Sequence, residues 1–148
     1  MKNDICCATC PMMKIIGRAR YTDDNNHIVR PCGVCFCGHP DAIAAFELLC
    51  PCRRRMPGFI AYTDRASDLP AIKTAPRWCP RKMYEKPVEI NKQQASQVIE
   101  TRKPRGMFFL AADNVVTGID NRTGDAWTAD FATKRKCLMW LRDYRSEE

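Results

Sequence analysis

The sequence predicts an α+β protein built from two small parts, and three observations lead to this prediction. Nine of the ten cysteines lie within the first 79 residues, in close-set groups. From residue 106 onward, apolar stretches alternate with polar turns, and two capped helical segments flank them. We therefore expect a Cys-rich module over residues 1–83, a linker over 84–90, and an α-β-β-β-α module over 91–148 with a three-stranded antiparallel sheet.

Short strands and one helix are expected in the N-terminal module. Residues 14–30 predict two short strands that a polar Asp-Asp-Asn-Asn turn connects. A helix is predicted over 40–49, because a proline stands at its first turn and Ile43 and Phe46 recur on one face. Residues 59–62, Phe-Ile-Ala-Tyr, predict a further strand.

The C-terminal module shows clearer local signals. The expected elements are a helix over 92–102, strands over 106–111, 115–119 and 126–131, and a helix over 133–144. Asn91 and Thr133 are suitable N-caps for the two helices, and Pro104 would end the first. Trp127 and Trp140 are expected in the core of this module, because so short a segment has little other large apolar material.

The cysteine groups predict a bound metal. The sequence shows no apolar leader and no run of about 18 apolar residues, so we expect a cytoplasmic protein that is neither secreted nor membrane-spanning. In a reducing cytoplasm structural disulfides are rare, and paired thiols indicate metal ligands or redox centres. Pairs of sulfur ligands suit a tetrahedral zinc ion, which can hold together a region with little apolar core. The expected cofactor is zinc, as one ion or two.

Spacing alone favours one ligand set. The run Cys7-x2-Cys10-x21-Cys32-x2-Cys35 is close to a ribbon-type zinc pattern, whose central gap is usually about 15–20 residues. A closed site of four thiolates leaves no position for water, so a zinc ion held this way would be structural rather than catalytic.

Two longer segments carry distinctive residues. The first runs from Cys7-Ala-Thr-Cys10 through Cys37-Gly-His39-Pro and Met56-Pro-Gly-Phe-Ile-Ala-Tyr62 to Ile72-Lys-Thr-Ala-Pro-Arg-Trp-Cys79-Pro80. The second joins Arg105-Gly-Met-Phe-Phe, Gly118-Ile-Asp-Asn-Arg-Thr-Gly-Asp-Ala-Trp127 and Cys137-Leu-Met-Trp-Leu141. In these segments, which cover most of the chain, the sequence resembles small uncharacterised Cys-rich, zinc-binding-like proteins of Firmicutes, phages and mobile elements. The resemblance brings no known activity with it.

The resemblance implies a different ligand set from the one that spacing favours. Its recurring thiols correspond to Cys7, Cys10, Cys37 and Cys79. This choice leaves a CxxC pair and a CxC pair that could hold a second ion. These cysteines are Cys32, Cys35, Cys50 and Cys52. His39 could replace a cysteine as a ligand, although a histidine at a helix entry is as often a polar cap.

Catalytic motifs are incomplete in this sequence. Pro31-Cys32-Gly-Val-Cys35 has the PCxxC form of zinc deaminases, but the upstream His27-Ile-Val lacks the glutamate of their HxE motif. The same CxxC is similar to a thioredoxin-like redox pair, but no βαβ unit precedes it. Asp120 and Asp125 flank a glycine-containing turn and are expected to form that turn rather than to act as catalytic acids.

Positive charge is concentrated in the Cys-rich module. Residues 1–83 hold 13 lysines and arginines against 7 acidic residues, out of a net charge of +7 for the chain. One basic face is predicted from Arg53, Arg54, Arg55, Arg65, Lys73, Arg77, Arg81 and Lys82. Phe59, Tyr62 and Trp78 could serve this face as stacking platforms for bases. Alternatively, the three rings form a small core around the zinc, and the arginines are solvated.

These patterns favour a non-enzymatic, zinc-stabilised protein that binds nucleic acid, or a nucleoprotein or protein complex with an acidic surface. Size, charge and the mobile-element resemblance point further, to a phage or mobile-element inhibitor of a host defence nuclease in the bacterial cytoplasm. The alternative is an enzyme of nuclease or thiol-redox type that uses the Cys-rich module.

Overall fold

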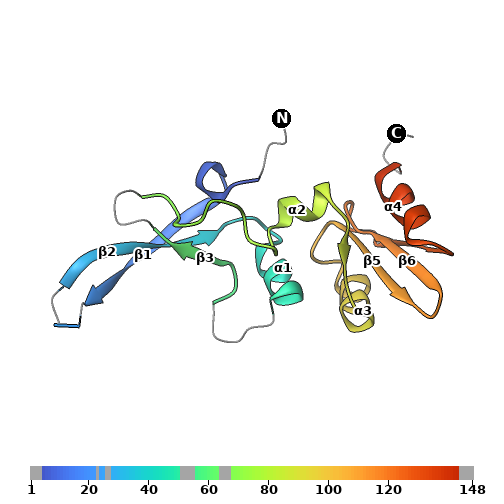
Figure 1. Ribbon diagram of the computed structural model, residues 1–148, viewed down its shortest axis with the longest axis horizontal. Helices are drawn as coiled ribbons and strands as arrows, with labels where there is room; N and C mark the ends of the chain where they lie inside the picture. The colour runs from blue at the N-terminus through green and yellow to red at the C-terminus, as the bar shows by residue number, and fades with distance from the viewer. Residues whose placement is uncertain (1–4, 23, 26–27, 51–55, 64–67, 144–148) are drawn as a thin grey trace. The chain divides into compact units, whose positions relative to one another are not determined.

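The structure is a computed structural model that describes residues 5–22, 24–25, 28–50, 56–63 and 68–143 (Figure 1). The chain divides into two compact units, Met1–Arg77 and Trp78–Glu148, called here the N-terminal and C-terminal units. The predicted α+β class is confirmed, because each unit combines helices with a sheet. None of the helices in the described ranges is long and apolar enough to cross a membrane.

The N-terminal unit is built on a three-stranded antiparallel sheet of order β1-β2-β3. Its elements are the 3-10 turn η1 (Cys7–Thr9), β1 (Met13–Thr22), β2 (Ile28–Cys37), α1 (Ala42–Leu49) and β3 (Phe59–Tyr62). The second strand runs seven residues beyond the expected end at Arg30, because its pairing with β3 continues the sheet. The cysteine group at 32–37 is therefore part of a strand rather than a loop.

The short helix α1 forms where expected and buries Phe46 as predicted, but its buried face does not include Ile43. Ala42, Ala45 and Phe46 are buried, at the i, i+3, i+4 spacing of one helical stripe. Ile43, expected on the buried face, is 58% exposed. Successive side chains of an α-helix are rotated by about 100° about its axis, so Ile43, the residue after Ala42, lies outside this stripe.

The C-terminal unit contains a four-stranded sheet of order β4-β5-β6-β7. Its elements are α2 (Pro80–Glu85), β4 (Val88–Glu89), α3 (Lys92–Thr101), β5 (Met107–Ala112), β6 (Val115–Asp120), β7 (Trp127–Phe131) and α4 (Lys134–Asp143). The predicted three-stranded antiparallel meander is present, but β4 adds a fourth strand parallel to β5. The order is thus α-β-α-β-β-β-α, and the expected linker 84–90 holds the end of α2 and β4.

Helix α3 begins with the capping arrangement that the sequence indicates. The Asn91 side chain accepts a hydrogen bond from the Gln94 backbone N–H at 2.8 Å, and Gln94 Oε1 accepts one from the Asn91 N–H at 2.9 Å. The first four backbone N–H groups of a helix have no partner within the helix, and two of them are satisfied in this way. The helix ends at Arg102, whose φ of 59° is left-handed.

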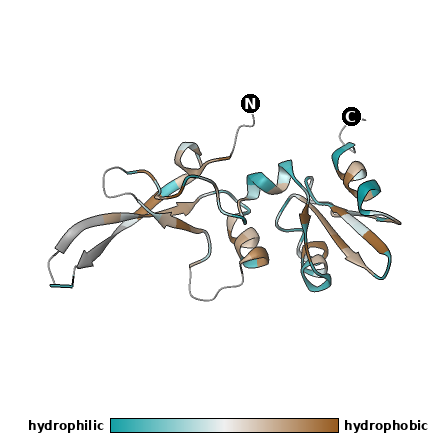
Figure 2. Cartoon of the chain, viewed as in Figure 1, coloured by the Kyte–Doolittle hydropathy of each residue, from teal (hydrophilic) through white to brown (hydrophobic). Residues whose placement is uncertain are grey.

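Helix α4 packs against one face of the sheet and closes a core of this unit (Figure 1). The buried cluster consists of Met107, Phe109, Val116, Cys137 and Leu141. Figure 2 shows both teal and brown on α3, which agrees with its amphipathic sequence, where Ala95 and Val98 are buried.

The turn between β6 and β7 is held by buried polar groups. Asn121, fully buried, donates from Nδ2 to the carbonyls of Arg102 and Pro104, each at 2.9 Å, and accepts from the Ala126 N–H at 3.1 Å. Arg122 pairs with Asp120 at 2.6 Å. These bonds satisfy groups that would otherwise be costly to bury, so this segment is structural, as predicted for Asp120.

Trp127 was expected in the core, and this expectation is wrong. It is 54% exposed, because it opens β7, which lies at the edge of the sheet. Trp140 is partly buried against the cluster and lies 5.6 Å from the Phe131 ring, between centroids.

Candidate functional site

The first predicted ligand pair lies in a tight turn. The Cys10 N–H donates to the Cys7 carbonyl at 3.2 Å across η1, which brings the two backbones together. A CxxC pair needs such a turn if both sulfurs are to reach one ion. Cys7 is buried and Cys10 is partly buried.

Backbone bonds bring a third predicted ligand to the same region. The Met13 N–H donates to the Cys10 carbonyl at 3.1 Å, and Met13 is paired with Cys37 across β1 and β2. The Gly38 N–H then donates to the Met12 carbonyl at 2.7 Å. Within the described part of the chain, however, no three His, Cys, Asp or Glu side chains are grouped as a metal site. The zinc ligand set stays a prediction.

The other predicted ligands are distributed over several elements. Cys79, the last member of the first set, is the N-cap of α2 and belongs to the C-terminal unit. Cys50 is the C-cap of α1, and Cys52 lies outside the described residues. No two of the nine described cysteines are joined in a disulfide.

Cys32 and Cys35 both lie in β2, and strand geometry separates them. Cys32 pairs with Ala19, and Cys35 pairs with Ile15 and Ala61. An odd spacing along a strand places side chains on opposite faces, with the Cα atoms about 10 Å apart. A disulfide needs Cα atoms within about 7 Å, and one ion needs both sulfurs on one side. In this conformation the pair acts neither as a redox dithiol nor as a joint chelate.

His39 is engaged as a helix cap. Its Nδ1 accepts a hydrogen bond from the Asp41 backbone N–H at 3.0 Å, just before α1 begins. This is the capping role that the sequence leaves open beside the ligand role. His27 lies outside the described residues.

Two buried thiols are disfavoured as thiolates by their surroundings. Burial raises the pKa of the Cys35 thiol above its ordinary value of 9.0, and burial does the same for Cys137. Reactive cysteines show the opposite shift, because a nearby positive charge or helix N-terminus stabilises their thiolate.

The predicted basic face is only partly described. Arg53, Arg54, Arg55 and Arg65 lie outside the described residues. Lys73 and Arg77 are exposed in the N-terminal unit. Arg81, exposed, and Lys82, partly buried, belong to α2 of the C-terminal unit.

An aromatic cluster forms on the N-terminal sheet, and it differs from the predicted one. Phe59 contacts Tyr62 with ring centroids 5.3 Å apart, and it contacts Phe36 at 5.9 Å. Trp78 is buried, 6% exposed, which agrees with the alternative that places this ring in a core, and it belongs to the C-terminal unit. Phe36 was missed because the predicted second strand ended before it. The signal that could have found it is the alternation of Cys32, Val34 and Phe36 on one face.

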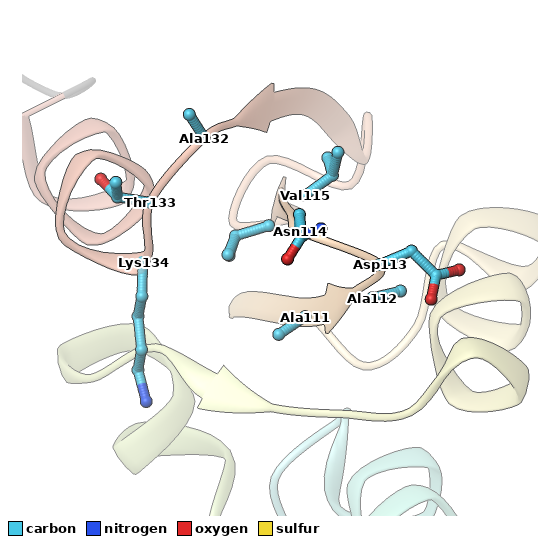
Figure 3. A pocket seen from close by; sticks show the side chains of 9 residues that line it. Ala111, Ala112, Asp113, Asn114, Val115, Ala132, Thr133 and Lys134 are labelled. Carbon is cyan, nitrogen blue, oxygen red and sulfur yellow. The ribbon is translucent and has the colours of Figure 1, made fainter.

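A hollow of about 270 Å³ lies in the C-terminal unit, between the β5–β6 turn and the start of α4 (Figure 3). Its lining is mostly small and apolar, from Ala111, Ala112, Val115, Val116 and Ala132, with Asp113, Asn114, Thr133 and Lys134 around them. The Lys134 Nζ lies 3.7 Å from the Glu89 carboxylate and 4.8 Å from the centroid of the Phe109 ring. Figure 3 shows its side chain running toward β4 rather than toward the hairpin turn. The hollow therefore lacks the converging polar groups typical of a small-molecule site.

Among the residues that the structure describes, two features suit a binding function: the cysteine-bearing turn at 7–10 and the aromatic face of the β1-β2-β3 sheet. No protein family, curated protein or solved structure matches this chain in the comparisons with known proteins.

Proposed function

We propose that the chain is a non-enzymatic, zinc-stabilised binding protein whose N-terminal unit engages nucleic acid or a nucleoprotein complex. The observation that carries this proposal is charge. Residues 1–77 contain 11 lysines and arginines against 7 acidic residues. Exposed Lys14, Lys73 and Arg77 belong to this unit. Such an excess supplies the phosphate contacts on which nucleic-acid affinity depends.

The backbone around the first cysteines supports the metal part of the proposal. Backbone hydrogen bonds link the turn at Cys7 and Cys10 to Met13, which is paired with Cys37, and this linkage supports a shared role for the three cysteines. In this proposal, zinc is held within the N-terminal unit by these three cysteines, and it stabilises the unit rather than reacting. Cys50 and Cys52, with one of Cys32 and Cys35, are the proposed source of ligands for a second ion.

The proposal is tested by the salt dependence of nucleic-acid binding. The observed association constant should fall steeply and log-linearly with salt concentration, because bound phosphates release counterions. Replacing Arg53, Arg54 and Arg55 together with alanine should flatten the log–log slope by about two to three units. The measurement is fluorescence anisotropy of labelled oligonucleotides, with the intact chain, over a range of salt concentrations.

A matched control is available in the other unit. Replacing Lys134, Arg135 and Lys136 together removes the same formal charge from the first turn of α4. The slope should then stay close to that of the unchanged protein. Equal flattening of the slope by both triple variants would show unspecific electrostatic attraction. If the chain bound no nucleic acid at low salt, nucleic acid would be rejected as the partner and a protein would take its place.

A further inference from the structure

A β-bulge brings two aromatic rings onto one face of the N-terminal sheet. Residues three apart in a regular strand point to opposite faces, so Phe59 and Tyr62 should be separated. In β3, however, Phe59 pairs with Phe36 while Ala61 pairs with the adjacent Cys35, so one extra residue is inserted at Ile60. Ile60 is buried, and after this extra residue the side chains of β3 alternate between the two faces in the opposite phase. Both rings consequently reach the same face.

The rings form a continuous row across β2 and β3. Phe36 meets Phe59 edge to face, at an interplanar angle of 79°, and Phe59 meets Tyr62 at 67°. This geometry is favourable for aromatic pairs and fixes the rings in place. Tyr62, at the end of the row, is nevertheless 48% exposed, and Phe36 and Phe59 are only partly buried. The row therefore remains accessible from solvent.

A positive charge lies beside the row. Lys14 is directly opposite Phe36 in the β1–β2 pairing, so the two side chains share a face. Its stem extends over Gly38, where an added Cβ would come within 2.8 Å of the Lys14 Cε. Accessible rings next to a cation suit a ligand that has flat faces and a polyanionic backbone.

We propose that the face formed by Lys14, Phe36, Phe59 and Tyr62 binds the unpaired bases of single-stranded nucleic acid by stacking. This inference rests on the proposed nucleic-acid function and names its substrate class. A duplex keeps its bases stacked on one another, whereas a single strand can place them on protein rings, with phosphates against the cations. Stacking tolerates any base, so the face selects single strands with little regard to sequence.

The test measures binding of the intact chain to three labelled probes of about 15 nucleotides: a DNA strand, an RNA strand of the same sequence, and the DNA duplex. The single strands should bind more tightly than the duplex. Tyr62→Ala should weaken single-strand binding about tenfold, while Tyr62→Phe, which keeps the ring, should bind like the unchanged protein. Lys14→Ala should flatten the salt slope by about one unit.

Trp127→Ala is the matched control, because it removes an equally exposed aromatic residue from a strand of the other unit. Its affinity should not change. If single strand and duplex bind equally and Tyr62→Ala binds like the unchanged protein, with the same circular dichroism, the stacking inference is overturned while the proposed function survives. If no probe binds, both are rejected. Comparison of the DNA and RNA strands shows whether the face accepts deoxyribose, ribose or both.

Discussion

Gly118 lies directly beneath helix α4, where there is no room for a side chain. A Cβ built on it would come within 3.0 Å of both the Cys137 Sγ and the Trp140 ring. Gly118→Ala should therefore lower the free energy of unfolding of the C-terminal unit by about 1–3 kcal/mol, because the helix must shift outward. Urea unfolding followed by tryptophan fluorescence measures this change.

The neighbouring position provides the control for this substitution. Thr117 is the preceding residue of β6, so its side chain points to the opposite face, where it donates to Asp130 at 2.6 Å in an exposed bond. Thr117→Ala should cost well under about 1 kcal/mol. Combining Gly118→Ala with Trp140→Leu should recover part of the loss. Equal effects of the two single variants would show that α4 does not press on Gly118.

Cys137 links the stability of the same core to pH. Its side chain is fully buried, and burial raises the pKa of the thiol above 9.0. Above about pH 9 the unfolded chain loses this proton while the folded chain keeps it, so the free energy of unfolding falls as pH rises. Cys137→Ala should be less stable at pH 8 because of the cavity, but its stability should fall less steeply toward pH 10.5. Parallel curves for the two proteins would contradict this account.

Strand β2 determines what its cysteines can do. With Cys32 and Cys35 on opposite faces, mild oxidation of the folded chain should produce no disulfide between them, whereas oxidation in denaturant should. Fragmentation mass spectrometry of the oxidised, alkylated chain locates the bonds. A Cys32–Cys35 disulfide formed under native conditions would mean that β2 opens there, and it would restore the thiol-redox enzyme as a candidate.

Local signals predicted the elements of the C-terminal unit well. The cap at Asn91 and the Asp113–Asn114 turn depend on residues adjacent in sequence, and both form as expected. Strand β4 was missed because two residues show no alternation, and its pairing with β5 lies across a helix. Phe59 and Tyr62 were predicted as stacking platforms, but the row that they form with Phe36 was missed for a related reason. Alternation assigns Phe59 and Tyr62 to opposite faces, and only pairing with β2 reveals the bulge.

At the scale of the whole molecule, the division at residue 77 separates two sources of stability. The C-terminal unit has a packed core under α4 and needs no metal in the proposed function. The N-terminal unit leaves Ile16, Met56 and Leu69 exposed, at 58%, 68% and 48%. A unit with so much apolar surface in solvent gains less from burial, which makes stabilisation by an ion more important.

The tryptophans allow the two units to be followed separately in the intact chain. Trp78, Trp127 and Trp140 all belong to the C-terminal unit. A strong zinc chelator should therefore leave the tryptophan-detected unfolding transition unchanged, while it lowers the temperature at which far-ultraviolet circular dichroism is lost from the N-terminal unit. Native mass spectrometry should find one or two zinc ions before chelation, fewer after Cys7→Ser, and the same number after Cys137→Ser. Finding no metal in the freshly purified chain, or a loss of tryptophan-detected stability on chelation, would show that the ion does not stabilise the N-terminal unit in the way proposed.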